Sequence, residues 1–156
     1  MENSNDKGIN AAQGSNVTHA GRFNGVQRPM YTPGRIDSLR EDEVFVFGSN
    51  LAGMHGGGAA RVARMKFGAV TGIGVGLQGQ SYAIPTMHGG VETIRPYVDE
   101  FITFTQNHPE LYFYVTRIGC GIAGFKDKDI APLFAQAATL PNVCLPESFA
   151  RIIAAM

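Results

Sequence analysis

The sequence predicts a three-layer α/β/α domain with a mixed, mostly parallel β-sheet. Its 156 residues suit a single domain, and 44% of them are hydrophobic, which is enough for a core at this length. Short apolar runs typical of strands alternate with longer segments typical of helices. This alternation indicates a largely parallel sheet covered on both faces. We place the domain at residues 29–156.

Residues 1–28 have a different composition from the rest. They are rich in Asn, Gly and Ser and almost free of large apolar residues before Val26. Such a stretch buries too little surface to offset the entropy of ordering the chain. We therefore expect a disordered tail over residues 1–28.

The first half of the domain contains two expected strands and one expected helix. The run Val44–Phe47 (VFVF) is β-branched and aromatic, which predicts a buried strand ending at Gly48. A helix is expected over Gly58–Phe67 and a second strand over Ser81–Pro85. Between them, Gly74–Gly79 matches G-x-G-x-x-G, but a strand follows it instead of a helix. We therefore expect a mobile loop there and no dinucleotide fingerprint.

The second half begins with the clearest helical pattern in the chain. Residues 91–107 place one apolar face on a 3.6-residue period, formed by Ile94, Val98, Phe101, Ile102 and Thr105. The elements expected after it are a strand over residues 111–116, a helix over residues 127–138 with Asp127 as its N-cap, a strand over residues 142–145 and a helix over residues 147–155.

Glycine is concentrated where acidic residues are missing. Twelve of the 20 glycines lie within residues 44–91, and this stretch contains no Asp or Glu. It contains basic residues instead: His55, Arg61, Arg64, Lys66 and His88. Glycines allow backbone N–H groups to approach phosphate oxygens, and a helix N-terminus adds a favourable dipole. The segment therefore predicts an anion-binding site.

The first candidate loop, Gly48–Gly58, connects the first strand to the helix that follows. Open α/β sheets bind ligands at such strand ends, and three consecutive glycines exceed what a turn needs. We expect Asn50 either to orient a ribose hydroxyl or a water, or to shape the loop as an Asx-turn. We expect His55 either to contact phosphate, to act as an acid or base, or to be an exposed loop residue. The expected ligand contacts are Gly48, Ser49, Asn50, Gly53, His55, Gly56, Gly57 and Gly58.

A second glycine-rich loop follows the third strand, and it is either a second phosphate loop or a structural turn. The two loops together could hold opposite sides of a diphosphate. Cys120 fits a small packing residue better than a nucleophile, and Phe125 fits ribose stacking and core packing equally well. The expected contacts are Ile118, Gly119, Cys120, Gly121, Ile122, Ala123, Gly124 and Phe125.

Charge and cysteine content exclude several classes of protein. The formal net charge is zero, which argues against general nucleic-acid binding. The two cysteines fit no zinc pattern, so we expect neither a metal site nor a bound cofactor. No run approaches about 18 apolar residues and no signal-peptide pattern is visible. We therefore expect a cytoplasmic protein that does not bind membranes.

Taken together, the two loops resemble those of the macrodomain family. In that family an Asn-bearing loop ends a strand and a Gly-Gly-Gly run opens the next helix, similar to Asn50 and Gly56–Gly58 here. The segments GGAARVARMKFG and RIGCG are similar to those of terminal ADP-ribose protein glycohydrolases. The segments FGSNLAGMHGGGAA, LQGQSYAIPT and TRIGCGIAGF are similar to a group of uncharacterised bacterial and phage proteins. The resemblance covers roughly residues 31–146.

The resemblance implies binding of ADP-ribose, but the catalytic residues of the family are not matched. One hydrolytic type carries an Asp shortly after the glycines, where this chain has Ala59-Ala60-Arg61. The terminal glycohydrolases use a Lys and an Asp at places that hold Thr86 and Ala123 here. An acidic residue near the domain start usually selects adenine in macrodomains, and Asp37 is the candidate here.

Three interpretations stay open on the sequence alone. The first is a module that binds ADP-ribose, a related NAD-derived nucleotide or an ADP-ribosylated macromolecule. The second is an ADP-ribosyl hydrolase or nucleotide-processing enzyme with a non-standard catalytic set that uses Asn50 and His55. The third is an interaction protein that kept the fold and lost the ligand. We expect Arg61 and Arg64 to form a solvated helix face, Asp127 and Asp129 to cap a helix, and His88 to be an ordinary loop residue.

Overall fold

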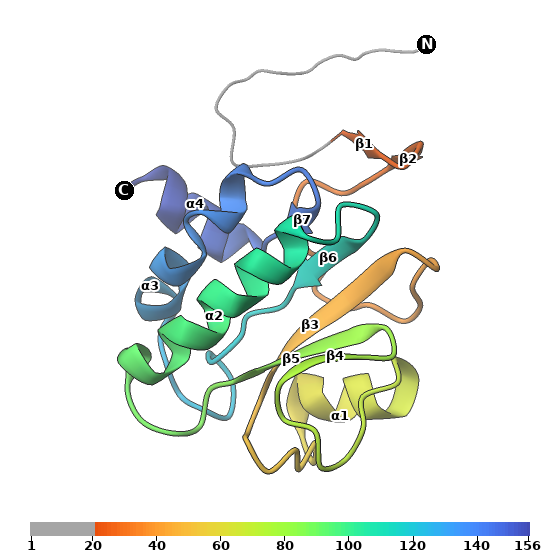
Figure 1. Ribbon diagram of the computed structural model, residues 1–156. Coiled ribbons are helices and arrows are strands. Elements are labelled where there is room, and N and C mark those ends of the chain that lie inside the picture. Colours follow the sequence, from red (N-terminus) through yellow and green to blue (C-terminus); the bar gives the residue numbers. More distant parts are fainter. Residues whose placement is uncertain (1–20) are drawn as a thin grey trace.

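The computed structural model describes residues 21–156, so residues 1–20 of the expected tail lie outside the described part of the chain. Its main feature is a five-stranded sheet with the order β4-β5-β3-β6-β7 (Figure 1). The central strand β3 (Glu43–Ser49) pairs in parallel with β5 (Ser81–Pro85) on one side and with β6 (Tyr112–Val115) on the other. This parallel centre brings the carboxyl ends of three strands to one edge of the sheet.

The two outer strands complete the mixed, mostly parallel sheet that the sequence predicts. β7 (Val143–Cys144) pairs in parallel with β6, and β4 (Gly76–Gln78) pairs antiparallel with β5. The mobile loop expected over Gly74–Gly79 is therefore wrong, because half of it, Gly76–Gln78, forms this edge strand. The expectation failed because the run is too rich in glycine to show a strand pattern.

Helices cover both faces of the sheet. α1 (Gly58–Lys66) packs through Ala60 and Ala63 against Phe45 and Phe47 of β3. The opposite face carries α2 (Val91–Gln106), α3 (Asp127–Ile130) and α4 (Glu147–Ala154), which lie together in Figure 1. The α2 prediction is confirmed in detail, because its five predicted face residues are all buried: Ile94, Val98, Phe101, Ile102 and Thr105.

The helix expected over residues 127–138 is wrong in its length and in its cap. α3 ends at Ile130, and two 3₁₀ turns follow at Ala131–Phe134 and Ala137–Thr139. Pro132 cannot donate the backbone hydrogen bond that a continuing α-helix needs, which accounts for the break. The N-cap is Lys126, so Asp127 is the first helical residue.

The expectation of disorder is wrong for the part of the tail that the structure describes, because residues 21–28 contain a β-hairpin. β1 (Arg22–Phe23) pairs antiparallel with β2 (Val26–Gln27). The turn residues Asn24 and Gly25 have φ of 51° and 75°. Asn-Gly is the preferred pair for such a two-residue turn, because both positions need positive φ.

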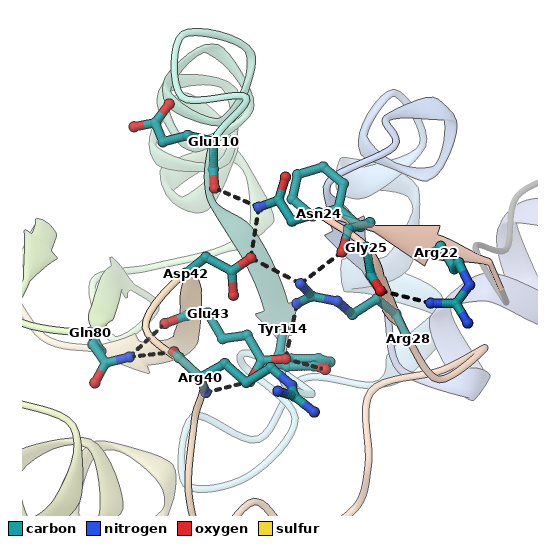
Figure 2. A network of polar contacts seen from close by, with 11 residues as sticks. Arg22, Asn24, Gly25, Arg28, Arg40, Asp42, Glu43, Gln80, Glu110 and Tyr114 are labelled. Carbon is teal, nitrogen blue, oxygen red and sulfur yellow. Dashed lines mark hydrogen bonds and ion pairs between the residues drawn. The ribbon is translucent and has the colours of Figure 1, made fainter.

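Arg28 fastens this hairpin to the sheet (Figure 2). Its side chain is 1% exposed, and its guanidinium bonds Asp42 at 2.9 Å and Glu43 at 3.0 Å. The guanidinium also lies 4.6 Å from the ring centre of Tyr112, while the Tyr114 hydroxyl donates to Glu43 at 2.9 Å. The cluster stands at the amino ends of β3 and β6. It therefore stabilises the edge of the sheet opposite the carboxyl ends.

Candidate functional site

A cleft of about 230 Å³ lies at the carboxyl ends of β3, β5 and β6. Both glycine-rich loops contribute to its wall, as expected for the ligand edge of a parallel sheet. The predicted residues that line it are Gly48, Ser49, Asn50, Gly57 and Gly58 from the first loop and Ile118, Gly119, Gly121, Ile122 and Ala123 from the second. The structure thus brings ten of the predicted residues together around one cavity.

Six predicted residues lie in the same loops but not on the cleft wall: Gly53, His55, Gly56, Cys120, Gly124 and Phe125. Seven lining residues were missed: Met54, Ala59, Ala60, Thr86, Met87, Thr116 and Arg117. Strand order could have found some of them. Thr86 follows β5 and Thr116 follows β6, and the carboxyl ends of parallel strands share one edge.

The cleft floor is open because residue 48 is a glycine. A Cβ added to Gly48 would lie 3.3 Å from Thr86 Oγ1 and 3.5 Å from the Gly119 backbone nitrogen. It would therefore lie between two polar groups from segments that follow different strands, Thr86 after β5 and Gly119 in the loop after β6. Within residues 21–156, neither the Thr86 hydroxyl nor the Gly119 N–H has a hydrogen-bond partner. Both groups are free to bind a ligand atom at the floor.

Two groups of unpaired backbone N–H donors belong to the cleft wall. At the start of α1, the N–H groups of Gly57, Gly58, Ala59 and Ala60 have no acceptor among the described residues. No side chain caps this helix, although most helix N-termini satisfy their first donors. In the second loop, the N–H groups of Gly121, Ile122 and Ala123 are also without an acceptor in residues 21–156.

Asn50 shapes the first loop through its side-chain amide. Its Oδ1 accepts a hydrogen bond from the Met54 N–H at 3.0 Å, and its Nδ2 donates to the Met54 carbonyl at 3.3 Å. The Asn50 carbonyl accepts from the Gly53 N–H at 3.0 Å. Both amide atoms are therefore engaged inside the loop, which favours the loop-shaping role over contact with a ligand.

His55 does not line the cleft and is only 2% exposed. Its Nε2 lies 3.0 Å from the Ile73 carbonyl, and its ring meets Phe47 edge-on with the ring centres 5.2 Å apart. A carbonyl accepts only, so Nε2 carries the proton and Nδ1 is left buried without a partner among the described residues. The expectation that His55 is an exposed loop residue is wrong, because the ring packs against β3; the position does not favour the alternative of phosphate contact, since His55 is not on the cleft wall.

Residues 72–74 support the first loop through hydrogen bonds and close packing. The Ser49 hydroxyl donates to the Gly74 carbonyl at 2.5 Å, and the Gly72 N–H donates to the Gly53 carbonyl at 3.0 Å. A Cβ on Gly53 would lie 2.4 Å from the Ile73 nitrogen, so no larger residue fits there. His88 also takes part, because its Nε2 accepts the Leu51 N–H at 2.8 Å. His88 is thus more than the ordinary loop residue expected.

An ion pair supports the second loop. The Arg117 guanidinium donates to Asp127 through Nε at 3.1 Å and through Nη2 at 2.6 Å. These bonds lower the pKa of the Asp127 carboxyl to about 2. Burial, together with Asp127, raises the pKa of the Cys120 thiol to about 12, so Cys120 has no thiolate character. Phe125 is half-buried and packs against the core next to Gly119.

The cleft wall holds no carboxylate, and Arg117 is its one charged residue among the described residues. Arg61 and Arg64 are exposed on α1 away from the wall, as predicted. Asp37 bonds Arg35 and Lys66, and Lys66 lies at the far end of α1. Asp37 does not line the cleft, so the expectation that it selects adenine has no support in the structure.

Long apolar side chains surround the mouth of the cleft. Met54, Met87 and Ile122 all line it and are 64%, 47% and 74% exposed. Ile122 reaches across to the first loop, because its Cδ1 lies 3.1 Å from the position of a Cβ on Gly57. The site thus combines a floor of backbone donors with an apolar rim. Such a combination is typical of small-molecule sites.

The places where the family resemblance implies catalytic groups lie on this wall, except Arg61. Ala59 and Ala60 are at the start of α1, Thr86 follows β5 and Ala123 is in the second loop. None of these side chains can transfer a proton at neutral pH or act as a strong nucleophile.

Comparison of the chain with models of protein families, with curated proteins and with solved structures finds no match in any of the three. Within residues 21–156, no helix is both long enough and apolar enough to cross a membrane. The same residues contain no cluster of three or more His, Cys, Asp or Glu side chains arranged to hold a metal ion.

Proposed function

We propose that the protein binds ADP-ribose, a related NAD-derived nucleotide or an ADP-ribosylated macromolecule, and that the cleft between the two glycine-rich loops holds the diphosphate. The observation that carries this proposal is the convergence of two groups of unpaired N–H donors, Gly57–Ala60 and Gly121–Ala123, on one cleft without carboxylates. Four of these residues, Gly57, Ala59, Ala60 and Ala123, are buried or half-buried, where backbone donors are normally paired. A phosphate chain supplies acceptors for both groups at once.

The electrostatics of the cleft favour an anion. The N-terminus of α1 carries a partial positive charge from the helix dipole, and Arg117 adds a guanidinium. The apolar rim of Met54, Met87 and Ile122 adds surface that suits the less polar parts of a nucleotide, its base and the carbon face of its ribose. Inorganic phosphate alone would leave this rim exposed.

The side chains of the cleft wall favour a protein that binds the ligand without hydrolysing it. Among the described residues, the wall holds no Asp, Glu, His, Lys or Cys that could serve as acid, base or nucleophile. The two candidates for a non-standard catalytic set are engaged elsewhere, Asn50 with Met54 and His55 with Ile73.

Calorimetric titration with ADP-ribose tests the proposal. We expect saturable binding to one site and a rise in melting temperature, because a ligand that binds only the folded state stabilises it. Incubation with an ADP-ribosylated protein should release no ADP-ribose. The proposal is wrong if millimolar ADP-ribose gives neither heat nor a thermal shift.

A further inference from the structure

Arg117 is the one charged side chain on the cleft wall within the described residues, yet it is not free. It is the second residue after β6, and its side chain is 59% exposed. Asp127, at the start of α3, takes the Nε and Nη2 side of the guanidinium in two parallel hydrogen bonds. This counter-ion is not itself on the cleft wall.

The pairing leaves part of the guanidinium available. Arginine has five N–H donors, and Asp127 uses one on Nε and one on Nη2. No hydrogen bond from Nη1 to a described residue is present. The remaining edge, formed by Nη1 and the second Nη2 hydrogen, matches the spacing of two phosphate oxygens. An anion in the cleft can therefore bind Arg117 while Asp127 still holds the other edge.

Asp127 also sets how strongly the cleft attracts anions. The pKa of its carboxyl is lowered to about 2 by Arg117, so Asp127 is ionised at neutral pH and cancels most of the guanidinium charge. The pair as a whole is close to neutral. An anion that binds Arg117 lies near the negative charge of the Asp127 carboxylate, and this repulsion weakens its binding.

We propose that Arg117 is the specificity-determining residue that selects phosphate-bearing ligands at the second loop, and that Asp127 is a counter-ion that attenuates its charge. The inference rests on the proposed function, because it assigns the charge that the nucleotide phosphates meet. The inference also predicts the direction of two changes in affinity: loss of Arg117 weakens anion binding, whereas loss of the Asp127 charge strengthens it.

Two variants that break the same ion pair separate this role from a structural one. Arg117→Gln and Asp127→Asn both remove the Arg117–Asp127 attraction, so a purely structural role predicts the same change for both. The proposal predicts opposite changes. For ADP-ribose we expect roughly tenfold weaker binding by Arg117→Gln, from the lost charge-assisted hydrogen bonds. We expect about threefold tighter binding by Asp127→Asn, from the lost repulsion.

Calorimetry at about 0.15 M salt is the measurement, with Lys126→Gln as the matched control. Lys126 is an exposed cation beside Asp127 that does not line the cleft, so its loss should change affinity less than twofold at this ionic strength. Adenosine, which lacks phosphate, is the ligand control and should respond to none of the three variants. Melting temperatures of Arg117→Gln and Asp127→Asn report whether both remain folded.

Inorganic pyrophosphate as a second probe separates this inference from the proposed function. If pyrophosphate binds with opposite changes in the two variants while ADP-ribose does not bind, the proposed nucleotide function fails and the role of Arg117 stands. If ADP-ribose binds wild type and both variants weaken it, or neither alters it, the inference on Arg117 and Asp127 is overturned. If neither probe binds wild type, both are overturned.

Discussion

A carboxylate placed among the second-loop donors should abolish most of the anion binding without disturbing the fold. Gly121 is the suitable position, because it lines the cleft and is exposed. A Cβ there meets no atom within 4 Å, and its backbone is outside the left-handed region that favours glycine. Gly121→Asp should therefore change the free energy of unfolding by less than about 0.5 kcal/mol, as for most surface substitutions.

The size of the binding effect follows from the distance between charges. Two unit charges about 4 Å apart interact with about 1 kcal/mol in bulk water and about 4 kcal/mol near a protein surface. The cleft is open to solvent on one side, so about 2 kcal/mol of repulsion is a reasonable middle value. We therefore expect Gly121→Asp to weaken ADP-ribose binding about thirtyfold.

Two controls separate charge from shape. Gly121→Asn has the same size without the charge and should weaken binding less than about threefold. Gly34→Asp adds the same charge at an exposed glycine that is not on the cleft wall, with no atom within 4 Å of its Cβ, and should leave affinity unchanged. Calorimetric dissociation constants for the four proteins decide the matter. Equal affinities for Gly121→Asp and wild type would refute the reasoning, as would an equal loss in the Asn variant.

Three further predictions concern stability. Arg28→Ala should lower the free energy of unfolding by about 3–5 kcal/mol in urea denaturation, because it leaves the buried Glu43 carboxylate without its ion-pair partner; a loss below 1 kcal/mol would contradict the anchoring role. Gly53→Ala should cost about 1–3 kcal/mol, since φ is 69° there and a Cβ would collide with the Ile73 nitrogen; an unchanged melting temperature would contradict this. The pKa of Asp127 is lowered from 3.8 to about 2 in the folded state, so its stabilisation is present above about pH 4 and lost as pH falls to about 2. Acid titration followed by circular dichroism should find that Asp127→Asn lacks this part of the acid-induced loss.

Periodicity and composition were sufficient to predict the helices and strands that have a strong local sequence pattern. The apolar run at Val44–Phe47 became the central strand, and the predicted face of residues 91–107 is the buried face of α2. Three β-to-helix connections in a row were enough to predict a parallel sheet and a ligand cleft at its carboxyl edge. These features depend on neighbours in sequence, which is why they were accessible.

Other features depend on contacts distant in sequence. The hairpin at residues 22–27 had a local signal in Asn24-Gly25, but its place on the sheet requires Arg28 to reach Glu43 and Tyr112. From composition alone, we predicted that this stretch belongs to a disordered tail. Burial of a polar side chain by partners on other strands leaves no trace in composition.

The candidate site was predicted at the level of loops and not of side chains. Which side of a glycine-rich loop faces the cleft depends on what packs behind it, so His55 was expected at the ligand but lies against Phe47. Arg117 belongs to the segment TRIGCGIAGF but was not expected in the site, because its approach to the cleft follows from the neighbouring positions of β3 and β6. Thr86 reaches the floor for the same reason, since β5 flanks β3 on the other side.

The central claim is that unpaired backbone N–H groups of two loops bind one diphosphate, and amide nuclear magnetic resonance tests it most directly. Titration of ¹⁵N-labelled protein with ADP-ribose should shift the amide signals of Gly57–Ala60 and of Gly121–Ala123 together, with a single dissociation constant. The amide signals of the Arg28 cluster at the opposite edge of the sheet should not shift. Absence of shifts at millimolar ADP-ribose, or shifts confined to residues outside these two loops, would contradict the account.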